Sequence, residues 1–134
     1  MAIIVSVHSY RGGTGKSNLT ANLATSIALM GKRVAIVDTD IQSPGIHVLF
    51  GLQEDQMRHS LNEYLWGKCE IKQAAHDVTP PGIAGRVYLI PASLKAGEIA
   101  RVLREGYDVS LLNDGFHRLL QELKLDALLI DTHP

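Results

Sequence analysis

Residues 10–17 read YRGGTGKS and follow, after two intervening residues, IIVSV, an apolar run of strand length at residues 3–7. Glycines let backbone N–H groups turn inward and approach phosphate oxygens, and the free N–H groups that open a helix add partial positive charge. Lys16 is then expected to reach the β and γ phosphates, and the Ser17 hydroxyl to bind Mg²⁺. The stretch therefore predicts a phosphate-binding loop, made of Gly12, Gly13, Thr14, Gly15, Lys16 and Ser17.

The loop departs from the strict pattern GxxxxGK[ST], which has glycine at the position of Tyr10. The alternative is a glycine-rich strand-to-helix turn that contains Gly-Lys-Ser by accident. An apolar strand before the loop and a helical pattern after it favour the phosphate loop. Gly31 stands where that helix is expected to end, and its predicted apolar face consists of Leu19, Leu23, Ile27 and Met30.

Apolar runs of strand length alternate with helical patterns along the chain, which is typical of an α/β domain. Four runs are nearly continuous, as expected for parallel strands covered on both faces by helices. A second long helix is predicted over residues 110–123. We therefore expect a three-layer αβα sandwich of the P-loop class with a mostly parallel sheet, its strands at residues 3–7, 34–37, 87–90 and 127–130.

Two acidic residues, Asp38 and Asp40, follow the second apolar run. Ligands of open α/β sheets bind beyond the carboxyl ends of the strands, which places both carboxylates near the phosphate loop. Mg²⁺ prefers carboxylates and water, and an attacking water needs an acceptor to orient it, so the two acids can divide these tasks. The alternative, that an aspartate after a strand merely caps a turn, is less favoured beside the phosphate loop.

A third acid, Asp131, ends the apolar run at residues 127–130. An apolar strand that ends in aspartate has the form of a Walker B element, which binds Mg²⁺ through water. This pattern is common by itself. It is more informative here because Asp131 is the third acidic residue expected at the strand ends beside one nucleotide site.

The segments RGGTGKS, DTD and DTHP together resemble the MinD/ParA group of P-loop ATPases with a deviant Walker A motif. In that group the loop reads KGGxGK[ST], the second strand ends in DxD, and a proline-containing turn follows the Walker B aspartate. The resemblance is close over residues 3–40 and again over residues 87–134. Residues 40–52 also resemble the Mrp-type iron-sulfur carriers and the bacterial tyrosine kinases.

The resemblance implies a role for each of five site residues. Lys16 is the phosphate lysine, Ser17 is the Mg²⁺ ligand, and Asp40 orients the attacking water. Asp38 and Asp131 act on Mg²⁺ from its outer sphere. It also implies a cytoplasmic switch that uses ATP and Mg²⁺, forms an ATP-dependent homodimer, and responds to an activating protein partner while it positions, partitions or assembles a cargo.

The chain departs from the family pattern in two respects. Arg11 occupies the place of the signature lysine that reaches the partner's nucleotide; it keeps the charge and adds a fork of donors. Domains of the family also continue for about as long again past the Walker B strand. The resemblance thus makes residues 1–134 the N-terminal part of a single P-loop ATPase domain, with the first strand poorly covered on one flank.

Composition narrows the remaining classes of function. The chain has 134 residues, 46% of them hydrophobic, and a formal net charge of −1, so no global positive field supports nucleic-acid or membrane contact. Cys69 is the only cysteine, which excludes a metal cluster built from several thiolates of this chain and favours a reduced, cytoplasmic setting. The six histidines lack a spacing such as HxxxH, so they are interpreted as surface or loop residues.

Three alternatives to the ATPase switch remain open. A regulator that binds ATP without turning it over is compatible with the Arg11 departure. A bacterial tyrosine kinase would need a tyrosine-rich tail, and this chain has four scattered tyrosines. An iron-sulfur carrier would need a CxxC motif, which the 134 residues lack.

Overall fold

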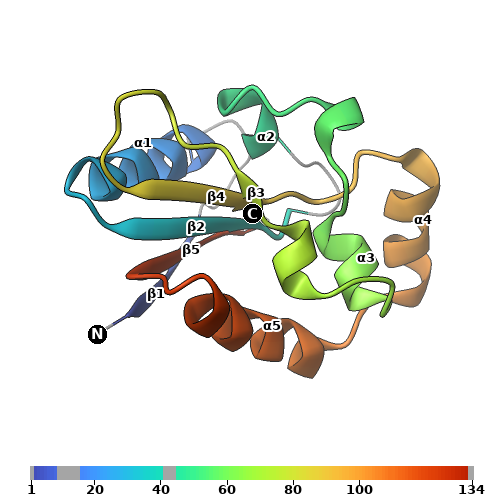
Figure 1. The fold of residues 1–134 in the computed structure, drawn as a ribbon. Coiled ribbons are helices and arrows are strands. Elements are labelled where there is room, and N and C mark those ends of the chain that lie inside the picture. Colours follow the sequence, from blue (N-terminus) through green and yellow to red (C-terminus); the bar gives the residue numbers. More distant parts are fainter. Residues whose placement is uncertain (1, 9–15, 41–44, 133–134) are drawn as a thin grey trace.

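The computed structural model describes residues 2–8, 16–40 and 45–132. Their strands form one five-stranded sheet in the order β1-β5-β2-β4-β3 (Figure 1). The strands β1, β5, β2 and β4 run parallel to one another, and β3 runs antiparallel to β4. Their bounds are β1 (Ile3–Val7), β2 (Arg33–Asp38), β3 (His76–Asp77), β4 (Arg86–Ile90) and β5 (Ala127–Asp131).

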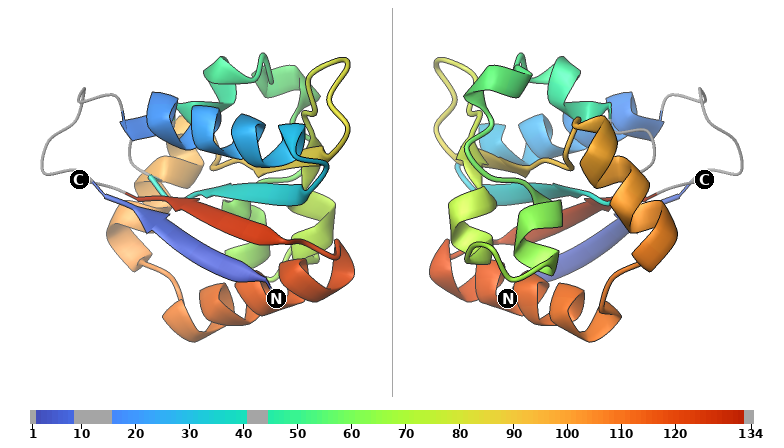
Figure 2. Two further views of the ribbon diagram at one scale, coloured as in Figure 1. Left: turned by 90° about the vertical axis from the view of Figure 1, so that its left-hand side faces the viewer. Right: turned by 90° about the vertical axis from the view of Figure 1, so that its right-hand side faces the viewer.

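Helices cover both faces of the sheet, with α1 on one face and α5 on the other (Figure 2). The α-helices are α1 (Lys16–Leu29), α2 (Ile46–Leu49), α3 (Leu61–Leu65), α4 (Ala96–Glu105) and α5 (Val109–Glu122), and the 3₁₀ helices are η1 (Glu54–Gln56) and η2 (Ile71–Ala74). The predicted three-layer α/β fold with a mostly parallel sheet is confirmed. No helix within the described part of the chain is long and apolar enough to cross a membrane.

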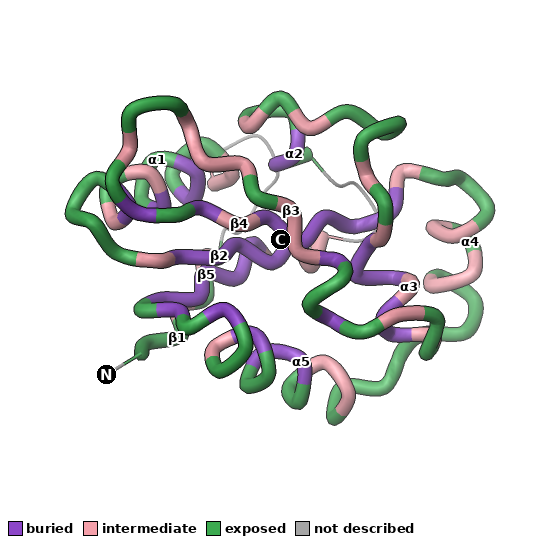
Figure 3. The backbone as a smooth tube through the Cα atoms, viewed as in Figure 1, coloured by how far each residue is buried: buried purple, intermediate pink, exposed green. Residues whose placement is uncertain are grey.

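Two apolar cores follow from the alternation of side chains along the buried strands. In β2, Val34 and Ile36 join the core beneath α1, whereas Ala35 and Val37 join the core beneath α5. In Figure 3, β5 is buried along its whole length and β2 along all but its first residue, while β4 is buried at three of its five residues. This explains why their sequences read as continuous apolar runs.

The first strand does not match the expectation that both faces of every strand are covered. Among the described residues β1 pairs with β5 alone and so forms an edge of the sheet. Ile3 is 52% exposed and Ile4 is 42% exposed. The poor cover expected for one flank of this strand is confirmed.

The predicted apolar face of α1 is wrong. Leu19, Leu23 and Met30 are exposed, and Ile27 is only half-buried. The buried positions of the helix are Thr20, Ala21, Ala24 and Ala28. Small side chains on this face let the helix axis lie close to the sheet, which leucine side chains would prevent. The predicted helix end is confirmed, since Gly31 has a φ of 80° just past it.

The second long helix lies where it is predicted, with Phe116, Leu119 and Leu123 buried. The elements that were not predicted include the short strand β3, the short helix α2 and the 3₁₀ helix η1. The interpretation of every histidine as a surface or loop residue is also wrong for His47, which is buried in α2.

Gly85 joins the end of α1 to the start of β4, and its N–H donates to the Ala28 carbonyl oxygen over 2.9 Å. A Cβ at this position would lie 2.7 Å from the same oxygen and would clash with the Lys32 carbonyl oxygen as well. Gly85→Ala should therefore lower the free energy of unfolding by about 2 kcal/mol or more, since both obstacles are backbone atoms. Denaturant unfolding measures the change.

Gly97 provides the matched control, because it lies within α4 and the space around a Cβ there is open. Gly97→Ala should leave stability unchanged or raise it by up to about 1 kcal/mol, the ordinary helix preference for alanine. Equal stability of the Gly85 and Gly97 variants would contradict the close approach at Gly85.

Candidate phosphate-binding site

The carboxyl ends of three neighbouring strands meet at one edge of the sheet. Asp131, the last residue of β5, pairs with Val7 at the end of β1 and with Asp38 at the end of β2. Parallel strands in this register bring the two aspartates side by side although they are far apart in the sequence. Helix α1 begins beside them, since its first two residues contact Asp131.

Lys16 and Ser17 share the carboxylate of Asp131. The Lys16 ammonium forms an ion pair with Oδ1, and the Ser17 hydroxyl donates to Oδ2 over 2.9 Å. The side chains of Lys16 and Asp131 are only 9% and 2% exposed. A buried lysine at the start of a 14-residue helix combines its own charge with the free N–H groups of that end, which suits an anion.

Asp38 is fully buried beside this group. Its Oδ1 accepts a hydrogen bond from the backbone N–H of Asp40 over 3.0 Å, while Oδ2 has no hydrogen-bond partner among the described residues. Burial raises the pKa of the Asp38 carboxyl to about 7, with the charges of Asp131 and Asp40 adding to the effect; the Asp40 N–H and Lys16 oppose it. A buried acceptor with unused capacity is well suited to a hydrated cation.

Two threonines, which the sequence analysis did not single out, form hydrogen bonds between the ends of neighbouring strands. The hydroxyl and the N–H of Thr39 both donate to the Asp131 carbonyl oxygen over 3.0 Å. The Thr132 hydroxyl donates to the Val7 carbonyl oxygen over 2.6 Å. The signal was available, because each threonine directly follows a strand-ending aspartate.

The remaining predicted site residues divide into two groups. Asp40 is half-buried just beyond β2 and is linked to Asp38 through its own N–H. The others lie outside the described residues: Arg11, Gly12, Gly13, Thr14 and Gly15.

The raised pKa of Asp38 predicts a pH dependence of stability in the nucleotide-free protein. The folded state keeps the carboxyl proton between about pH 4 and pH 7, a range in which the unfolded chain has lost it. The free energy of unfolding should therefore fall by up to about 4 kcal/mol as the pH rises through this range. Asp38→Asn removes the titrating group and should flatten this part of the profile, measured by urea unfolding at each pH.

The readout is the slope and not the absolute stability, because asparagine also changes the local hydrogen bonding. Asp55→Asn removes an exposed carboxylate in η1 and serves as the control, which should retain the wild-type fall. A fall of the same size in the Asp38 variant would show that Asp38 is not its source.

Comparison with known proteins agrees with this geometry. A family model described as ParA, NUBPL iron-transfer P-loop NTPase, matches residues 1–134. An uncharacterized ATP-binding protein of Methanocaldococcus jannaschii is 35% identical over 127 residues, which are 95% of this chain and 45% of that protein. The septum site-determining protein MinD of Bacillus subtilis is 32% identical over 133 residues, 98% of this chain and 45% of its own length.

A solved structure of a relative has a similar fold. The septum site-determining protein MinD of Pyrococcus horikoshii, complexed with Mg-ADP, superimposes with a TM-score of 0.78 at 27% identity. The match covers 98% of this chain and 49% of that one. Its ligand is of the kind that the sequence predicts, and the chain spans about half the length of the relatives it matches.

Proposed function

This chain belongs to the ParA family of P-loop NTPases, and on that premise we propose that it is the MgATP-binding part of a dimerising ATPase switch of the MinD/ParA type. In this proposal residues 1–134 are the N-terminal part of a single ATPase domain. The observation that carries it is the buried contact of Lys16 and Ser17 with Asp131 at the carboxyl ends of the strands.

Lys16 is the residue proposed to bind the β and γ phosphates of ATP. Its ammonium is held by Asp131 and lies beside the start of α1, where free N–H groups favour a negative charge. A polyphosphate competes with Asp131 for this ammonium. The ammonium is already positioned at the strand ends before nucleotide binds.

Ser17, Asp38 and Asp131 are proposed to hold Mg²⁺ with its water. The residues fit this ion, because a hydroxyl and two carboxylates lie together and Asp38 Oδ2 is buried without a partner among the described residues. When bound, Mg²⁺ neutralises the charge that develops on the β and γ phosphates. Ser17 supplies the direct ligand, and the two aspartates accept hydrogen bonds from metal-bound water.

Asp40 is proposed to orient the attacking water. Its backbone is fixed by the hydrogen bond to Asp38, so its carboxylate is tethered next to the cation site. Arg11 is proposed to cross to the nucleotide of a second copy, a role that rests on its position in the loop sequence.

The wider role follows from the family resemblance. We propose an ATP-dependent homodimer in the cytoplasm that binds an activating protein partner and positions, partitions or assembles a cargo. Nothing in the charge of this segment favours nucleic acid or membrane as that cargo.

Two other functions each have one observation in their favour. A nucleotide-binding regulator without turnover is favoured by the arginine at position 11. An iron-transfer function is favoured by the description of the matched family, although the single cysteine of residues 1–134 cannot hold an iron-sulfur cluster alone.

The test is turnover of MgATP by the full-length gene product as its concentration is raised, together with the oligomeric state at each concentration. A rate per chain that rises with dimer formation supports the switch. Tight ATP binding without turnover at any concentration supports the regulator, and iron that co-purifies in stoichiometric amount supports iron transfer.

A further inference from the structure

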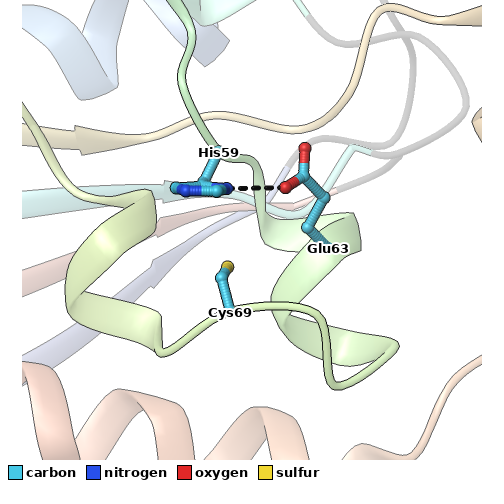
Figure 4. Close-up of side chains that lie close together, drawn as sticks. All are labelled: His59, Glu63 and Cys69. Atoms are coloured by element: carbon cyan, nitrogen blue, oxygen red, sulfur yellow. Dashed lines mark hydrogen bonds and ion pairs between the residues drawn. The ribbon is translucent and has the colours of Figure 1, made fainter.

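The carboxyl ends of β2 and β5 and the start of α1 together form the strand-end site. Outside it, three different metal-binding side chains lie close together: His59, Glu63 and Cys69 (Figure 4). One ligand atom from each side chain lies within 4.8 Å of the other two. We propose that these residues form a second metal site, one for a divalent transition metal of the Zn²⁺ class. Its ligands are the imidazole of His59, the carboxylate of Glu63 and the thiolate of Cys69, and a water completes the four.

The backbone positions the three ligands through local contacts. Ser60 caps the start of α3 by accepting a hydrogen bond from the Glu63 N–H, which places His59 just before the helix and Glu63 in its first turn. The chain then turns at Gly67, where φ is 74°, and the Lys68 N–H donates to the Glu63 carbonyl oxygen over 2.8 Å. This turn returns Cys69 to the side of α3 on which Glu63 lies.

The ligand distances suit a small ion after a modest rearrangement of the three side chains. His59 Nδ1 and Glu63 Oε2 are 2.7 Å apart and share a hydrogen bond, which a metal would replace. Zn²⁺ binds nitrogen, oxygen and sulfur at about 2.0 to 2.3 Å, so ligand atoms around it lie about 3.4 Å apart. The His59 and Glu63 atoms would therefore separate slightly, and the Cys69 sulfur, which lies within 4.8 Å of a ligand atom of each, would move closer to them.

The donor set selects the class of metal. A thiolate and an imidazole favour Zn²⁺ and its neighbours in the transition series, whereas Mg²⁺ and Ca²⁺ prefer oxygen ligands alone. Solvent reaches the cluster, because the side chains of His59 and Glu63 are 36% and 20% exposed. Both also border a small hollow lined by Ser93 and Glu98, which gives water access to the fourth position.

The state of the thiol argues against a reactive cysteine. Burial, with the charges of Glu63 and Glu70, raises the pKa of Cys69 to about 11. The thiol is protonated at neutral pH and is a poor nucleophile. The same acidic surroundings attract a cation, and metal binding releases the S–H proton to solvent as the metal–sulfur bond forms.

Zn²⁺ titration of the nucleotide-free, full-length protein, followed by calorimetry, tests the proposal. One equivalent should bind with saturation. His59→Gln and Cys69→Ser should each weaken Zn²⁺ affinity at least about tenfold. Removing a residue that only supports a metal ligand already lowers metal affinity 10- to 100-fold. His117→Gln removes an exposed imidazole on α5 and is the matched control, which should bind as the wild type does.

Co²⁺ gives a readout that does not depend on stability, because thiolate coordination produces a charge-transfer absorption band. The wild type should show this band with one equivalent of Co²⁺, and Cys69→Ser should lose it while its metal-free melting temperature stays close to that of the wild type. Absence of the band in the wild type, or Zn²⁺ affinity equal in the wild type, His59→Gln and Cys69→Ser, would overturn the proposal.

Discussion

Lys16→Ala should lower the affinity for MgATP by at least about a hundredfold. Hydrogen bonds to charged groups are worth about 1.5 to 3 kcal/mol each, and every 1.4 kcal/mol is a tenfold change in affinity. The lysine also supplies the buried cation next to the start of α1. Calorimetric titration of the full-length protein with MgATP measures the loss.

The same substitution leaves the Asp131 carboxylate buried without its cation, which by itself destabilises a protein by several kcal/mol. Lost binding must therefore be separated from lost folding. Lys16→Ala combined with Asp131→Asn removes both charges and should recover much of the stability. Because Asp131 is itself proposed to hold Mg²⁺, the Asp131→Asn single variant is the reference for binding. The double variant should bind MgATP much more weakly than this reference, whereas equal affinities would show that Lys16 acts only through folding.

Asp40→Asn is the contrasting variant. Because a group that orients water acts mainly on the way to the transition state, MgATP affinity should stay within about threefold of the wild type. Hydrolysis should fall by about 10² to 10⁴, the range typical of a lost general base. Equal losses of affinity in the Lys16 and Asp40 variants would contradict the role proposed for Asp40.

The strand-end site was predictable because its geometry follows from rules of chain direction. Asp38 and Asp131 each end an apolar run, and parallel strands place such ends at one edge of the sheet. The structure pairs these two residues directly. What the sequence did not reveal is the fully buried state of Asp38, which depends on everything that packs around it.

Helix α1 shows where periodicity stops being informative. Leu19 and Leu23 share one face of the helix, but Ala21, Ala24 and Ala28 share another at the same kind of spacing. Hydrophobicity favours the leucines as the core face, whereas close packing on the sheet selects the alanines. Spacing identifies residues that share a face and leaves open which face is buried.

The His59 cluster was missed for a related reason. A search for two histidines at helical spacing cannot find a histidine, a glutamate and a cysteine that meet only because the chain turns at Gly67. The histidines of this sequence lack that spacing, and the side chains that the structure brings together are of three kinds. The apolar pattern predicts the direction of strands, but it does not predict the turn that brings Cys69 back to His59 and Glu63.

Arg11→Ala should cut dimer-dependent hydrolysis by about 10³ to 10⁵, the range for an arginine supplied in trans to a phosphoryl transfer. MgATP binding to dilute monomer should change little, because the proposed target of Arg11 is the nucleotide of the other copy. Arg11→Lys should restore part of the rate, since the charge returns without the bidentate fork. Turnover is measured at concentrations where sedimentation shows dimers.

Mixing two inactive variants distinguishes action across the interface from action within one chain. An Arg11→Ala chain keeps Lys16 and so can bind MgATP, while a Lys16→Ala chain keeps Arg11 and can offer it to a partner. A mixed dimer then contains one competent site, and an equal mixture should recover activity that neither variant has alone. If the mixture stays inactive although mixed dimers form, or if Arg11→Ala alone turns over MgATP at the wild-type rate, Arg11 does not act in trans. The catalytic charge would then have to come from the same chain that holds the nucleotide, and Lys16, which the structure places beside Asp131 at the start of α1, is the candidate for it.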